Sequence, residues 1–155
     1  MRKWLKHLKN QKGLTLIELL AVVVILGIIA AIAVPAIGNI INNSKDDAHR
    51  SNALLIINAA KLGIVSGEVT STMLDTNNQI SLDELVAAGV LDGLPADPSV
   101  DGKTYKSSSF VAYTPASNST GAKYLITLQS DETTAKTYYY QKTETEINAG
   151  ADPTP

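Results

Sequence analysis

The chain has 155 residues, a formal net charge of −2 and no cysteine. This length provides one domain of ordinary size beside a membrane-associated segment, and it excludes two substantial cores. The absence of cysteine excludes a disulfide framework, a thiolate nucleophile and a cysteine-based metal centre. A globular head in this chain therefore has to be held together by packing and hydrogen bonds alone.

Basic residues are concentrated at the start of the chain. Residues 1–13 contain five of the 13 basic residues and no acidic residue, which is typical of the cytoplasmic flank of a membrane segment. Without this stretch, eight basic and 15 acidic residues remain. An acidic remainder gives no strong signal for nucleic-acid binding, because phosphate contacts require clustered Lys or Arg. Residues 1–13 indicate a leader that is removed by processing.

An almost continuous apolar stretch follows, over residues 14–41. The 26 residues from 19 to 44 carry no charge, and as a helix they would extend about 39 Å, enough to cross a hydrocarbon core about 30 Å thick. Gly27 and Pro35 interrupt the stretch, and we expect a bend between them because Pro35 removes a helical hydrogen-bond donor. Glu18 is the one charged residue in this stretch. A carboxylate beside such an apolar segment needs a compensating partner.

Residues 42–66 continue the helix with an amphipathic pattern. Apolar residues at helical spacing predict one buried face, formed by Ala48, Leu55, Ala59, Leu62 and Val65. Four more apolar residues widen this face and predict contact with a broad surface such as a sheet: Leu54, Ile56, Ile57 and Ile64. His49 falls on the polar side and is expected in solvent. Gly63 and Gly67 mark the expected end of the helix.

Residues 67–142 predict a small head with an antiparallel sheet. After a polar connection, Ser81 and Glu84 fit a capping box that opens a short helix closing at Gly89. Three strand-like runs then predict a meander, over residues 109–114, 122–128 and 135–141. The sequence thus predicts an α+β fold in which a long N-terminal helix packs on a small antiparallel sheet. Residues 143–155 are short of large apolar residues and are expected to be loose.

Few residues of the head suggest chemistry. Three aspartates in a turn-rich stretch are candidate oxygen ligands for Ca²⁺, although caps and solvated turns are the commoner role of such residues: Asp92, Asp97 and Asp101. A run of tyrosines is expected to alternate across a strand and to serve packing: Tyr138, Tyr139 and Tyr140. No convergent set of polar groups is evident in residues 66–155, so we predict neither an enzyme nor a cofactor.

The basic leader, the pair Gly13 and Leu14, Glu18 and the apolar helix together resemble the type IV pilin and pseudopilin family, whose precursors share a class III signal peptide. The resemblance extends in layout over residues 1–65. It implies that a membrane-embedded prepilin peptidase cuts between Gly13 and Leu14 and methylates the new amine of Leu14. Glu18 then matches the family's glutamate at the fifth mature position, and Pro35 matches its helix-kinking proline.

The resemblance implies a structural subunit of a type IV pilus that forms a homo-oligomeric helical filament for adhesion, motility or DNA uptake. It implies a single-pass precursor in the cytoplasmic membrane with its head outside, and then a cell-surface filament built by assembly machinery together with minor pilins. Glu18 would pair with the Leu14 amine of a neighbouring subunit and set the axial stagger. The nearest alternative is a pseudopilin of a type II secretion or competence DNA-uptake system. Residues 94–98 faintly resemble a segment of the major pseudopilins of type II secretion. A signal-anchored membrane protein with a binding head is the remote alternative.

Overall fold

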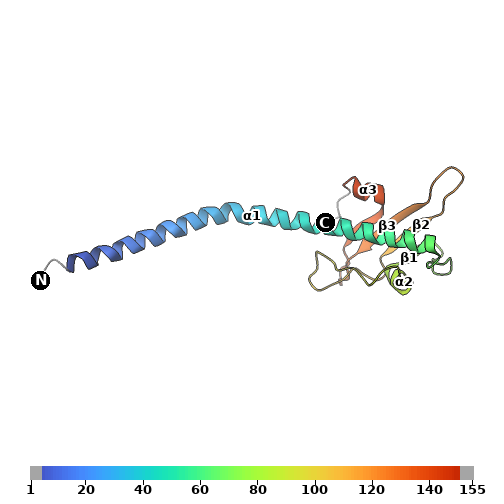
Figure 1. Cartoon of the computed structure of the whole chain (residues 1–155), viewed down its shortest axis with the longest axis horizontal. Helices are drawn as coiled ribbons and strands as arrows, with labels where there is room; N and C mark the ends of the chain where they lie inside the picture. Colours follow the sequence, from blue (N-terminus) through green and yellow to red (C-terminus); the bar gives the residue numbers. More distant parts are fainter. Residues whose placement is uncertain (1–4, 151–155) are drawn as a thin grey trace. The chain divides into compact units, whose positions relative to one another are not determined.

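The computed structural model describes residues 5–150, with the side chains of residues 16–150. The chain divides into two compact units between Asn43 and Ser44. The first unit is helical throughout its described part, and the second combines the end of the same helix with a sheet and two short helices (Figure 1). The α+β class predicted from the sequence is confirmed.

Helix α1 extends from Leu5 to Ser66. Many residues of its first half are β-branched and have modest helix propensity in water, but helix is the only single-segment conformation that satisfies every backbone group in an apolar environment. Pro35 lies inside the helix, where it leaves the carbonyl of Ala31 without its helical donor. The helix continues through Gly27 and Pro35, and the bend expected between them stays a prediction.

The end of α1 lies at two glycines, as the sequence predicts. Ser66 is the last helical residue, and Gly67 follows with a φ of 81°, a left-handed conformation that costs glycine little. Gly63 packs closely against the chain that returns from the helix. Its carbonyl accepts a hydrogen bond from the N–H of Val69 at 2.9 Å, and a Cβ on Gly63 would lie 2.6 Å from Val69 Cγ2. The turn after α1 therefore depends on both glycines.

The face of α1 that packs on the head agrees only in part with the predicted one, because Ile56, Ile57 and Ala59 are buried as expected. The buried residues recur at a spacing of three and four: His49, Ala53, Ile56, Ala60 and Gly63, with Ile57 and Ala59 beside them. Three residues of the predicted face are instead exposed, at 51%, 63% and 82%: Leu55, Leu62 and Val65. The helix is apolar on more than one side, so periodicity alone does not select a face. The small residues on the buried face allow the helix to approach the sheet closely.

Four antiparallel strands form one sheet in the order β1-β2-β3-β4. The predicted meander corresponds to β2 (Phe110–Thr114), β3 (Lys123–Gln129) and β4 (Thr137–Thr143) and is confirmed. The end of α1 lies along this sheet (Figure 1). Side chains from the helix and the strands share one core, which includes Ile56, Ile57, Ile80, Val111, Ile126 and Leu128.

Strand β1 (Gln79–Ser81) begins in the stretch that the sequence predicted as a polar connection and ends at Ser81, the predicted cap residue. It pairs with β2, and its central residue Ile80 is fully buried opposite Val111. The preceding turn is closed by the carboxylate of Asp75, which accepts hydrogen bonds from the backbone N–H of Asn77 at 2.8 Å and of Gln79 at 2.9 Å. A strand of three residues carries too little periodicity to be predicted from sequence.

Helix α2 (Leu82–Ala87) begins with the predicted capping box. Ser81 Oγ accepts from the N–H of Glu84 at 3.3 Å, and the Glu84 carboxylate accepts from the N–H of Ser81 at 2.7 Å. Gly89 then adopts a φ of 72° beyond the helix. Both ends of this element are confirmed, because they depend on local hydrogen bonds that the sequence specifies directly.

The expectation of a loose segment from residue 143 is wrong for its first part. A second capping box, formed by Thr143 and Glu146, opens helix α3 (Glu144–Asn148). Ile147 is fully buried in the core and anchors this helix to the head. The capping box, the burial of Ile147 and the ion pair between Glu144 and Lys61 together hold this segment on the head. Residues 151–155 lie outside the described part of the chain.

The three consecutive tyrosines of β4 do not alternate as predicted. Tyr138 and Tyr139 are both buried, whereas Tyr140 is 65% exposed. The ladder between β3 and β4 shifts register on both sides of Leu128. A register shift of this kind locally removes the two-residue alternation of a strand, so two adjacent side chains enter the core.

Candidate processing and assembly site

The residues predicted to be processed and to direct assembly lie on the first half of α1. Gly13 and Leu14 belong to the helical backbone, while the side chain of Leu14 lies outside the described residues. Glu18 follows one turn later and its side chain is exposed. Within the described part of the chain, Glu18 takes part in no ion pair. Among the side chains that the structure describes, residues 16–150, this carboxylate thus has no compensating charge.

The surface of α1 around Glu18 is apolar and uncovered. From residue 16 to residue 41, the large apolar side chains are each between 50% and 70% exposed. Among the described residues, α1 is the one helix long and apolar enough to cross a membrane, judged by length and composition. An apolar surface of this extent marks a site that is covered by lipid or by other protein chains.

The head contains a buried polar cluster around His49, which corrects the expectation that this residue is in solvent. His49 is 1% exposed. Its Nδ1 lies 2.7 Å from Tyr105 Oη, and its Nε2 lies 2.8 Å from Ser99 Oγ. The imidazole also stacks on the Tyr138 ring, with a centroid distance of 3.9 Å. Both ring nitrogens therefore have uncharged hydroxyl partners.

Asp97 is the buried charged member of this cluster. Its carboxylate oxygens lie 3.0 and 2.9 Å from the hydroxyl of Tyr138, and Oδ1 also accepts from the N–H of Ser99 at 2.8 Å. Asp92 and Asp101 are exposed. No group of three or more His, Asp or Glu residues that could hold a metal occurs in the described range. The three aspartates considered as Ca²⁺ ligands are therefore not brought together, and Asp97 serves internal hydrogen bonds.

Burial governs the protonation of this cluster. It lowers the pKa of His49 below the ordinary value of 6.5, and the nearby carboxylate of Asp97 opposes this shift in part. Burial likewise raises the pKa of Tyr105 and of Tyr138, and the hydrogen bond to Asp97 raises that of Tyr138 further. At neutral pH the imidazole and both phenols are thus uncharged, and Asp97 is held by neutral donors.

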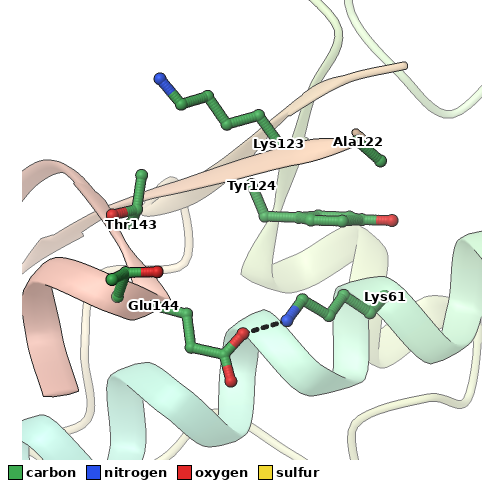
Figure 2. Close-up of a pocket in the computed structure, with 7 residues that line it drawn as sticks. Lys61, Ala122, Lys123, Tyr124, Thr143 and Glu144 are labelled. Atoms are coloured by element: carbon green, nitrogen blue, oxygen red, sulfur yellow. Dashed lines mark hydrogen bonds and ion pairs between the residues drawn. The ribbon is translucent and has the colours of Figure 1, made fainter. Parts of the chain in front are cut away.

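A pocket of about 280 Å³ lies between α1, β3 and the start of α3 (Figure 2). Lys61 and Glu144 form an ion pair across it, and the Lys61 ammonium lies 5.6 Å from the centroid of the Tyr124 ring. Lys123 points away from this pair (Figure 2), and Thr143 is engaged in the cap of α3. Lys61 and Glu144 therefore neutralise each other, and neither is available as a single charge for a ligand.

Comparison with known families bears on the first half of α1. Residues 8–34 match the prokaryotic N-terminal methylation motif. The chain carries a class III signal of the type IV pilin kind. No curated protein and no solved structure matched the chain. Among these comparisons, the class III signal is therefore the one finding that bears on function.

The class III signal implies a substrate of prepilin peptidase, of pilin or pseudopilin type, in a context of pilus assembly. Together with the apolar helix it fits a membrane-anchored precursor, and with the fold it suggests a structural protein. Gly13, Leu14, Glu18 and Gly27 lie inside the matched residues, and Pro35 lies one residue beyond them. Cleavage at Gly13 and the assembly roles of these residues stay predictions.

Two features of the head were not predicted from the sequence, namely the His49 cluster and the Lys61–Glu144 ion pair. The His49 cluster has a signal in the sequence, because His49 lies four residues before Ala53 and seven before Ile56, in line with the face that is buried. The Lys61–Glu144 pair has no such signal. Its members are 83 residues apart, and only the docking of α3 brings them together.

Proposed function

We propose that this chain is a structural subunit of a type IV pilus, which is inserted as a membrane precursor with its head outside and then polymerises through α1 into a cell-surface filament. The observation that carries the proposal is the methylation motif at residues 8–34. It lies on the same helix as the uncovered apolar surface of residues 16–41. Lipid covers this surface in the precursor, and neighbouring α1 helices cover it in the filament.

Cleavage between Gly13 and Leu14 would change the electrostatics of the helix start. In the precursor, Glu18 lies well inside α1. In the mature chain it lies in the first turn after Leu14, where the helix dipole favours an anion. The cut also creates an α-amino group on Leu14, whose positive charge is preserved on methylation. Pairing this amine with Glu18 of a neighbouring subunit satisfies both charges and sets the axial stagger, since apolar contacts alone specify register weakly.

The first experiment determines the N-terminus of the mature protein by mass spectrometry of its N-terminal peptide. The expected peptide begins at Leu14 and carries one methyl group on the amine. As a control, Gly13→Val keeps the apolar helix but removes the small residue before the cut, and it should accumulate as an uncleaved membrane protein. A mature chain that begins at another residue contradicts the proposal.

The second experiment distinguishes a pilus from a pseudopilus, because both would contain the same processed helix. Material sheared from the cell surface is imaged by electron microscopy after labelling with an antibody to the head. Long labelled filaments are expected for a pilus subunit. Label that stays in the envelope fraction, with a secretion or DNA-uptake defect on deletion, would assign the chain to a pseudopilus. A deletion strain complemented with the Gly13→Val chain provides the matched negative control.

A further inference from the structure

The loop of residues 95–105 is a closed unit that rests against α1 and β4. The N–H of Asp97 donates to the Lys103 carbonyl at 2.9 Å, and the N–H of Tyr105 donates to the Pro95 carbonyl at 3.1 Å. These bonds fix the shape of the loop from inside. How the loop stays attached to the rest of the head depends on a second set of contacts.

Four hydrogen bonds between the loop and α1 involve two helix residues, His49 and Asn52. His49 contacts Tyr105 Oη and Ser99 Oγ. Asn52 Nδ2, one turn later, donates to the Ala96 carbonyl at 3.2 Å and to Tyr105 Oη at 3.3 Å. His49 is the titratable member of this pair, so its protonation state decides whether these contacts can all be satisfied together.

The hydrogen bonds of the neutral imidazole leave neither of its nitrogens free for an added proton. Asp97 Oδ1 lies 3.9 Å from His49 Nε2, so we assign the imidazole proton to Nε2, which donates to Ser99. His49 Nδ1 then accepts the proton of Tyr105 Oη, whose oxygen accepts from Asn52. A second proton on Nδ1 removes the acceptor of the Tyr105 hydroxyl and leaves a buried donor unpaired.

The charges that face His49 come from each surrounding segment and act in opposite directions, and all of them are smaller influences on its pKa than burial. Asp97 in the loop and Asp46 on α1 favour the protonated imidazole. Lys136, which precedes β4, and Lys45 on α1 disfavour it. The neutral phenols of Tyr105 and Tyr138 complete the surroundings. Burial is therefore the deciding influence, and it opposes protonation for as long as the loop covers the imidazole.

We propose that His49 is an acid-sensitive latch: gain of a proton breaks its contact with Tyr105 and frees the loop of residues 95–105 from α1, while the sheet stays folded. Opening exposes the imidazolium to water and removes the burial that opposes its charge. The loop stays covalently attached to the head but is exposed when open. The surface of the head therefore depends on pH. This inference concerns the head alone and does not depend on the filament role.

The test is amide hydrogen exchange of the full mature chain in detergent micelles, compared at about pH 7.5 and about pH 4.5 with rates corrected for the chemical effect of pH. Peptides that cover residues 95–105 should exchange roughly tenfold faster at the lower pH, the signature of local opening. Peptides that cover β2 and β3 should keep their protection. Equal acceleration in loop and sheet would mean global unfolding and would overturn the proposal.

His49→Gln supplies an amide that can hydrogen-bond but does not titrate in this range. In this variant, loop exchange should be the same at both pH values, and an undiminished acid effect would overturn the proposal. Lys136→Gln is the charge control, since it removes a facing charge and leaves the imidazole, so the acid effect should remain.

A measurement on the unmodified mature chain covers the case in which the variant does not fold. The NMR signal of His49 Cε1–H reports its protonation directly, and His49 is the only histidine after residue 13. Backbone amide signals of the loop should change with the same midpoint as the imidazole. A loop that stays closed after His49 has titrated, a different midpoint, or an imidazole that does not titrate while the head is folded would each contradict the latch.

Discussion

The hydroxyl of Tyr138 lies 3.0 and 2.9 Å from the two carboxylate oxygens of Asp97, which precedes it by 41 residues. This contact attaches the loop of residues 95–105 to β4 and provides a hydrogen-bond donor to a buried carboxylate. Tyr138→Phe should lower the free energy of unfolding of the head by about 1.5–3 kcal/mol, the usual cost of losing a hydrogen bond to a charged group. Near-UV circular dichroism in urea, on the chain in detergent, measures this change. Tyr140→Phe is the matched control, and because Tyr140 is 65% exposed it should change stability by less than about 0.5 kcal/mol.

The orientation of α1 on the head is tested by two neighbouring residues. Ile56→Ala removes a fully buried side chain and should destabilise the head by about 2–5 kcal/mol through lost burial and a residual cavity. Leu55→Ala truncates a side chain that is 51% exposed and should cost less than about 0.5 kcal/mol in the isolated chain. The same urea titration compares them. Similar losses in both variants would show that the helix presents a different face to the sheet.

Gly63 is required by close packing at the end of α1. Alanine has the higher helix propensity, so Gly63→Ala would normally stabilise a helix by about 0.5–1 kcal/mol. Here its Cβ would lie 2.6 Å from Val69 Cγ2, and we expect a net loss of about 1–3 kcal/mol. Combining Gly63→Ala with Val69→Ala removes the clash, so the double variant should lose less than the sum of the single losses. A stabilising Gly63→Ala would contradict the packing described for this turn.

The head should lose stability in mild acid because of His49. Its pKa is lowered from 6.5 by burial in the folded head, so between the folded-state pKa and 6.5 the unfolded chain binds a proton that the folded chain does not. The free energy of unfolding therefore falls as pH decreases from 6.5 to the folded-state pKa, and the contribution is fully present above 6.5. The check is the difference in urea stability between the unmodified chain and His49→Gln as a function of pH. A difference that stays constant from neutral pH to below the His49 midpoint would contradict this linkage.

Filament formation should depend on the charge of Glu18. Glu18→Gln keeps the size of the side chain and removes the partner proposed for the Leu14 amine, so the variant should enter the membrane normally and form no filaments. Membrane fractionation and electron microscopy of sheared material give the two readouts. Leu19→Ala changes the adjacent apolar residue without changing charge and should still form filaments. Normal filaments from Glu18→Gln would remove the proposed role of this carboxylate.

Features that depend on local chemistry could be predicted from the sequence. The apolar stretch and the motif around Gly13 and Glu18 are contiguous in the chain, and the match at residues 8–34 covers the motif and most of the apolar stretch. The capping box of Ser81 and Glu84 and the turn at Gly67 also follow from neighbouring residues. In each case the interacting groups lie within a few residues of one another, so their spacing is fixed by the backbone itself.

Tertiary structure decided what depends on contacts between distant segments. It selected the Ile56 side of α1 in place of the Leu55 side, and it placed His49 against Tyr105, 56 residues later. It also ordered α3 through the burial of Ile147. A helix with apolar residues on several sides, or a polar residue beside a buried face, has more than one favourable local arrangement. The choice is made only when the sheet supplies the surface that is buried, because the free energy of burial belongs to the pair of surfaces and not to either sequence segment alone.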